Sequence, residues 1–133
     1  NQHTFGVLTG VNRWSTHINW SNNNVYFDPG VCCNNPRNFN NSSRRDSFDQ
    51  YSFLRNSNTV RIKQNSTMKV NGSHTKADCS ATTGFGIGAG YGGGINARGH
   101  GNNSFLELIM FKKEITGTDL ILLEKNQNLF WQI

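Results

Sequence analysis

The sequence has few charged residues, few prolines and no long apolar segment. Charged side chains make up 16% of the 133 residues, and there are only two prolines and three cysteines. No apolar run approaches the roughly 18 residues that a membrane-spanning helix needs, so we expect no membrane insertion. The chain opens with neither a signal peptide nor an initiator Met. We therefore expect Asn1 to be a processing point or the edge of a fragment, with the domain belonging to a longer chain.

Asparagine, glycine and aromatic residues are plentiful instead. The chain holds 20 Asn, 14 Gly and 15 aromatic residues. Asn and Gly favour turns and disfavour long helices, while large aromatic side chains can build a core between sheets. The length fits one domain, and no shift in composition marks a linker. We expect a single domain over 1–133.

The net charge of +5 raises the question of nucleic-acid binding. The basic residues are scattered along the chain, with no run longer than two and no recognisable recognition helix. A solvated, mildly basic surface explains the charge, and we expect no nucleic-acid partner.

Short aromatic and β-branched segments separated by Asn, Ser and Gly predict antiparallel strands. The expected strands are 4–8, 15–20, 24–28, 49–55, 59–64, a strand with Met68 and Val70 between turns at Asn65–Ser66 and Asn71–Gly72, then 85–88 and 104–113. The last of these is the longest apolar segment, which predicts a central strand. Many short strands at near-regular spacing predict an all-β sandwich or jelly roll.

One short helix is expected near the end of the chain. Thr116 or Thr118 can cap it and Asp119 would lie in its first turn. Leu120, Leu123 and Ile121 would form its apolar face over about two turns. The predicted core consists of Val25, Phe27, Phe53, Val60, Ile62, Phe85, Ile87, Leu106, Leu108 and Met110, with Phe105 and Ile109 facing the helix or a partner.

Three stretches together resemble a known family. They are "NRWSTHINWSNNNVYFDPGVCCNNPR", "YSFLRNSNTVRIKQNSTMKV" and "FLELIMFKKEITGTDLILLE", and they are similar in order to the laminin-G-like, concanavalin-A-like jelly-roll domains of viral (phage) and microbial surface proteins. The resemblance implies an antiparallel two-sheet jelly roll with one short C-terminal helix. The family has two or three strands before the Trp segment, so the sandwich here would lack its first strands, or a neighbouring chain would complete the sheet edge.

The three cysteines leave several pairings open. No C-x-x-C pair is present, so a zinc site is not expected, and we predict neither metal nor cofactor. A bridge from Cys32 or Cys33 to Cys79 would close a long loop and place the protein outside the reducing cytosol. A vicinal Cys32–Cys33 bridge and three free thiols are the alternatives.

Glycosylation sequons are the second indication of compartment. Six Asn residues begin an N-x-Ser/Thr pattern, and Asn65, Asn71 and Asn102, in expected loops, are the better acceptors. A phage or ordinary bacterial protein would leave them bare.

No catalytic signature emerges. Glycosidases of the concanavalin-A-like fold need closely spaced carboxylates, and Glu107 stands alone on its expected strand, with Glu114 about 23 Å away if the segment is extended. The G-x-G-x-x-G match at Gly88, Gly90 and Gly93 does not open a helix, as a dinucleotide site requires. We expect no enzyme activity.

The Gly-rich run between 84 and 101 has two interpretations. It is either a flexible crossover between strands or a loop that presents Tyr91, Asn96, Arg98 and His100 to a ligand. We predict a non-catalytic recognition module for a glycan or other cell-surface ligand, on a virion or extracellular protein. The alternative is a structural or assembly module, a decoration, fibre or filament subunit whose partners are other subunits.

Overall fold

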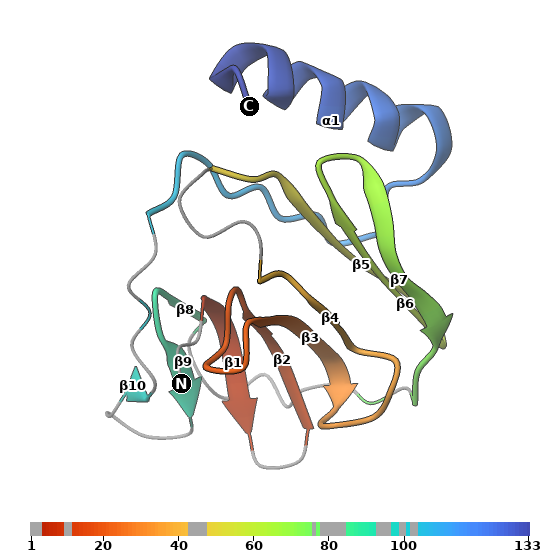
Figure 1. Ribbon diagram of the computed structural model, residues 1–133. Coiled ribbons are helices and arrows are strands. Elements are labelled where there is room, and N and C mark those ends of the chain that lie inside the picture. Colours follow the sequence, from red (N-terminus) through yellow and green to blue (C-terminus); the bar gives the residue numbers. More distant parts are fainter. Residues whose placement is uncertain are drawn as a thin grey trace.

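The computed structural model describes residues 4–9, 12–42, 48–75, 77, 85–92, 97–98, 101 and 104–133. The elements in these ranges are β1 (Phe5–Thr9), β2 (Asn12–His17), β3 (Asn24–Val31), β4 (Asn38–Asn40), β5 (Tyr51–Asn56), β6 (Thr59–Gln64), β7 (Thr67–Ser73), β8 (Gly86–Ile87), β9 (Gly90–Gly92), β10 (Ala97–Arg98) and α1 (Gly117–Trp131). Figure 1 shows two sheets, with α1 lying over the β5–β7 sheet. The protein is mostly β with one C-terminal helix, which confirms the predicted class in its coarse form.

The larger sheet contains seven strands. Its order is β10-β9-β1-β2-β3-β4, and β8 also pairs with β1. Its pairs are antiparallel except β1 with β9, which run parallel. The smaller sheet has the order β5-β6-β7 and is antiparallel throughout. Within each sheet, strands that follow one another in the chain pair with each other, except β8 and β9.

The turn between β6 and β7 follows from Asn65 and Ser66, as predicted. Both residues have positive φ, 48° and 63°, and Gln64 pairs with Thr67 across them. This is the geometry of a two-residue hairpin loop, which Asn adopts at low cost.

The turn predicted at Asn71–Gly72 is wrong, because both residues lie inside β7 and Gly72 pairs with Val60. A Cβ atom on Gly72 would lie 2.4 Å from Pro36 Cγ. Glycine at this position therefore allows the chain around Pro36 to pack closely on β7.

The core lies between the two sheets. Phe27 of β3 is buried together with Val60 and Ile62 of β6 and Val70 of β7. The ring of Phe53 on β5 lies 5.3 Å from that of Phe27 and joins the sheets. The predictions of Val25, Phe27, Val60 and Ile62 as core residues are confirmed, and Phe53 is half-buried against them.

The second half of the predicted core is wrong. Residues 104–113 form no strand, and Leu106 and Met110 are exposed while Leu108 is half-buried. Phe85 and Ile87 are also exposed, since β8 is only two residues long and pairs with β1 at its Phe5 end. The apolar pattern of 104–113 is that of a central strand. Among the described residues, however, this segment has no neighbouring strand with which to pair.

Helix α1 is longer than predicted and begins where expected. Thr116 occupies the N-cap position without a side-chain cap hydrogen bond, and Asp119 lies in the first turn. The helix runs for 15 residues to a left-handed Gln132. Leu120 and Leu123 are half-buried, but Ile121, predicted for the same face, is exposed.

Polar contacts hold α1 on the sheet. The Glu124 carboxylate is buried, accepts a hydrogen bond from Ser52 Oγ at 2.7 Å and pairs with Lys63 Nζ. Gln50 Nε2 donates to the Glu124 carbonyl oxygen at 3.0 Å. Further along, Arg61 pairs with Glu114 at 2.9 Å. The C-terminal region thus covers the charged face of β6, while part of its own apolar surface stays exposed to solvent.

Candidate functional site

A polar hollow lies where three loops meet beside β7. We call it the amide pocket; its volume is about 620 Å³ and it is lined by Asn34, Asn35, Asn58, Ser73, His74 and Thr75. Asn58 comes from the β5–β6 turn, the asparagine pair follows β3, and the rest lie at and after the end of β7. Every one of these side chains can donate or accept hydrogen bonds. The pocket is therefore suited to a ligand rich in hydroxyl or amide groups.

Backbone contacts bring these loops together. His74 N–H donates to the Asn58 carbonyl oxygen at 2.6 Å, which fixes the end of β7 against the β5–β6 turn. On the other side, the close approach of Pro36 to Gly72 sets the loop after β3 against β7. Residues that are far apart in the sequence thus form one wall.

His74 is the buried member of the pocket. It is only 6% exposed, and its Nε2 atom has no hydrogen-bond partner among the described residues. Burial lowers the pKa of His74, against the opposing effects of backbone hydrogen bonds to Thr75 and Val31 and of the Asp28 charge. The ring is therefore neutral at pH 7.

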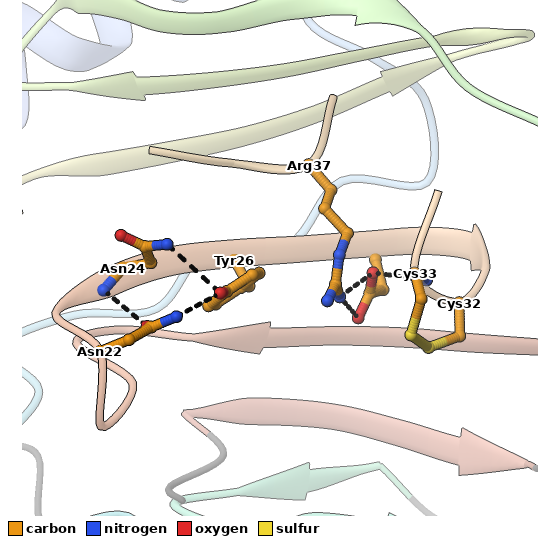
Figure 2. A network of polar contacts seen from close by, with 7 residues as sticks. Asn22, Asn24, Tyr26, Cys32, Cys33 and Arg37 are labelled. Carbon is orange, nitrogen blue, oxygen red and sulfur yellow. Dashed lines mark hydrogen bonds and ion pairs between the residues drawn. A yellow bond between two sulfur atoms is a disulfide. The ribbon is translucent and has the colours of Figure 1, made fainter. Parts of the chain in front are cut away.

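A buried ion pair anchors the loop after β3 at both of its ends. Asp28 of β3 is fully buried and accepts hydrogen bonds from Arg37 Nη1 at 2.7 and 2.8 Å. It also accepts one from the Cys33 N–H at 3.3 Å. Figure 2 shows Arg37 reaching down to β3, with Tyr26 on one side and Cys33 on the other. One carboxylate therefore fixes the residues on either side of Asn34 and Asn35.

An aromatic and amide surface continues from this ion pair along β3. The Arg37 guanidinium lies 4.6 Å from the centroid of the Tyr26 ring, a cation–π distance. The Tyr26 hydroxyl accepts hydrogen bonds from the side-chain amides of Asn22 and Asn24 (Figure 2), and Asn22 is the main cause that lowers its pKa. Trp20 packs edge-on against Tyr26 at 6.2 Å. Such a surface suits the apolar face of a sugar ring.

The cysteine pairing differs from the long-range bridge that we favoured. Cys32 and Cys33 are bonded to each other, so neither sulfur is left for Cys79, which lies outside the described residues. Cys33 has φ of 70°, in the left-handed region, and this turn conformation brings the two neighbours together. The vicinal alternative is the one that the structure contains.

Two of the four residues predicted in the Gly-rich run have described positions, and these lie elsewhere. Two short strands form where a loop was expected: Tyr91 lies on β9 and Arg98 on β10, with Tyr91 opposite Ala97. Asn96 and His100 lie outside the described residues. Since β9 and β10 are at the far end of the larger sheet from β3 and β4, Tyr91 and Arg98 are not part of the amide pocket.

The sequence predictions did not single out His74 or the five asparagine and hydroxyl residues around it. The only local signal is a histidine between Ser73 and Thr75 directly after a strand. A polar triplet of that kind is common at strand ends, and the orphaned Nε2 depends on contacts from distant loops.

The predicted glycosylation sites differ in their surroundings. Asn71 is exposed on β7. The Asn65 side chain is occupied, since Nδ2 donates to Asp49 Oδ1 and Oδ1 accepts from the Gln50 N–H, both at 2.8 Å. Asn102 lies outside the described residues. A glycan on Asn65 Nδ2 would leave that nitrogen one hydrogen for its bond to Asp49.

A second, larger hollow lies between β5, residues 104–115 and α1. We call it the helix groove; its volume is about 800 Å³. Its lining includes Phe105, Leu106 and Ile109, together with Leu123 and Trp131 of α1. We predicted that Phe105 and Ile109 face the helix or a partner and that Leu106 lies in the core. Phe105, Leu106 and Ile109 remain 37–40% exposed. The apolar surface here is incompletely covered.

The described residues contain neither a metal-ligand cluster nor a helix that could span a membrane. No group of three or more His, Cys, Asp or Glu side chains is placed to hold a metal ion in the ranges given above. In the part of the chain that the structure describes, no helix has both the length and the apolar character needed to span a bilayer.

Comparisons with known proteins add no relative. Neither a protein-family model nor a curated protein nor a solved structure matches this chain.

Proposed function

We propose that this chain is a non-catalytic recognition module that binds a neutral carbohydrate in the amide pocket. The observation that carries the proposal is His74, a buried histidine that lines a hollow of amides and hydroxyls and whose Nε2 atom, itself buried, has no hydrogen-bond partner among the described residues. A buried acceptor without a partner costs free energy, and a ligand hydroxyl would supply the missing donor. A neutral sugar offers several such hydroxyls at once.

The chemistry of the pocket favours a neutral ligand over an anion. None of the described side chains that line it is a lysine or an arginine, and the lowered pKa of His74 keeps its ring uncharged at pH 7. An acidic sugar or a phosphate would meet lone pairs and amide dipoles without a formal positive charge. The aromatic surface at Tyr26 and Trp20 provides a neighbouring place for a second sugar ring.

The wider setting of the proposal comes from the family resemblance. It now rests on the first two stretches, because the third contains residues 104–113, which form no strand. We propose a laminin-G-like jelly-roll module on a virion or an extracellular protein, with a glycan or cell-surface partner. The disulfide between Cys32 and Cys33 is compatible with an oxidising compartment.

A glycan array followed by NMR titration tests the proposal. Asn58→Ala and Asn34→Ala should each weaken binding by about threefold to tenfold, the value of one hydrogen bond. Asn56→Ala, an exposed asparagine at the end of β5 outside the pocket, is the matched control and should bind as the wild type does.

Tyr91→Ala and Arg98→Ala test the site predicted from the Gly-rich run in the same assay. Loss of binding in these two variants alone would move the carbohydrate site to β9 and β10. Absence of any carbohydrate binding by the wild type would refute the proposed function.

A structural or assembly module is the second candidate, and the helix groove favours it. The groove and the outer side of α1 leave large apolar side chains exposed, including Leu129 and Phe130 at 70% and 73%. Contiguous exposed apolar surface marks sites of protein association. Its test is the state of association of the protein in solution.

A further inference from the structure

We propose that the Cys32–Cys33 disulfide sets the shape of the amide pocket, so that a thiol reductant changes the pocket and weakens its binding of carbohydrate. The ligand in this inference rests on the proposed function. The change of shape rests on the geometry of the loop alone.

The disulfide lies at the entrance of the loop that supplies two pocket residues. Asn34 and Asn35 follow Cys33 directly, and Arg37 closes the loop. The buried Asp28 carboxylate accepts hydrogen bonds from the Cys33 N–H and from the Arg37 guanidinium. A displacement of Cys33 therefore passes directly to the two asparagines, because the far end of the loop stays fixed by the ion pair.

The backbone of Cys33 is held in a conformation that it would not choose by itself. Its φ of 70° lies in the left-handed region, which is unfavourable for a residue other than glycine. The ring closed by two adjacent cysteines ties the backbone there. Once the ring opens, that cost favours return to negative φ, which turns the Cys33 N–H away from Asp28 and redirects Asn34.

A small reductant can reach the bond. Cys33 is exposed and Cys32 is half-buried. One thiolate of a dithiol such as dithiothreitol attacks a sulfur of the pair and breaks the S–S bond to form a mixed disulfide. The second thiol then releases it, so that the dithiol becomes a cyclic disulfide and its two electrons, with two protons, end on Cys32 and Cys33 as thiols.

The experiment compares oxidised and reduced protein in a Cys79→Ser background, where the pair holds the only cysteines. NMR spectra follow the amide signals of Asn34 and Asn35 and the imidazole signals of His74, with Val60 in the core as the reference. N-acetylglucosamine and methyl β-galactoside are titrated as the neutral sugar probes. The variant Cys32→Ser/Cys33→Ser, which cannot form the bridge, serves as the reductant-insensitive control.

On reduction we expect the Asn34, Asn35 and His74 signals to shift while Val60 stays in place, and the affinity for the bound sugar to fall about tenfold. The double serine variant should match the reduced protein with and without dithiothreitol. Unchanged pocket signals, or equal affinity in both redox states, would overturn the inference. If the pocket signals shift but neither sugar binds the oxidised protein, the control of shape stands and the proposed carbohydrate ligand fails.

Discussion

His74 is the buried histidine on which the proposed function depends. A histidine that is buried as the neutral ring contributes stability only while it stays neutral, because protonation would place a charge where desolvation penalises it. Nε2 without a partner adds a further cost, which a hydroxyl donor from a ligand would remove. Under the proposed function, the missing hydrogen bond makes the free pocket less stable than the pocket with a ligand bound.

The first prediction concerns the pH dependence of stability at His74. Its folded pKa is lowered by burial, so the unfolded chain binds a proton more readily, with an ordinary pKa of about 6.5. The stabilising contribution is complete above that value and is lost as pH falls below it. Urea unfolding between pH 5 and 8 should show this loss in the wild type and a smaller one in His74→Gln. An equal slope in the two proteins would contradict the prediction.

The second prediction concerns the Asp28–Arg37 pair. Arg37→Met would leave the fully buried Asp28 carboxylate without its cation, and removal of one partner of a buried pair costs about 3 kcal/mol. Lys69→Met is the matched control, since Lys69 is exposed and lies 6.0 Å from the Phe39 ring; it should change the free energy of unfolding by less than about 0.5 kcal/mol. Similar losses in the two variants would argue against a structural role for the pair.

At the scale of elements, the strands that carry their own turn signals could be predicted from the sequence. The β6 strand was placed at its observed bounds because Val60 and Ile62 alternate with Arg61 and Lys63 and because Asn65–Ser66 ends the strand. The segment 104–113 could not be placed in the same way. Its apolar pattern is local, but a strand also needs a neighbour, and among the described residues this segment has none.

The candidate site could not be predicted from local sequence patterns, for a related reason. The amide pocket joins Asn34, Asn58 and His74, which come from three loops, so that no spacing in the sequence marks it. The vicinal bridge was one of the open alternatives, and its choice depends on the left-handed turn at Cys33.

The third prediction concerns the attachment of α1. Glu124 is the buried side chain of the helix and bonds to Ser52 and Lys63 on the sheet. Glu124→Ala would leave the half-buried Lys63 unpaired, so hydrogen exchange in 117–131 should rise and stability should fall by about 3 kcal/mol. Asp119→Ala, at an exposed first-turn position, should cost less than about 1 kcal/mol. If exchange in α1 rises equally in both, the ion pair does not hold the helix.

At the scale of the whole molecule, the apolar side chains are unevenly distributed. The sheets bury their core around Phe27, yet the C-terminal region docks mainly through ion pairs and turns Ile121, Leu122, Leu129 and Phe130 outward. Water-exposed Leu and Phe side chains in such numbers are unfavourable for an isolated chain. The assembly candidate follows from this asymmetry, whereas the recognition candidate follows from the amide pocket.

The last prediction separates these two candidates. If the outer side of α1 is an interface between copies of this chain, sedimentation velocity should show a dimer or larger species that grows with concentration. Leu129→Ser/Phe130→Ser should weaken that association about a hundredfold, because burial of each side chain contributes about 1.5 kcal/mol or more. Lys125→Ala/Asn126→Ala, on exposed polar positions of the same helix, should leave it nearly unchanged. A wild type that stays monomeric at every concentration would exclude self-assembly through α1, while carbohydrate binding at the amide pocket could still be present, since the pocket shares no residue with the helix groove.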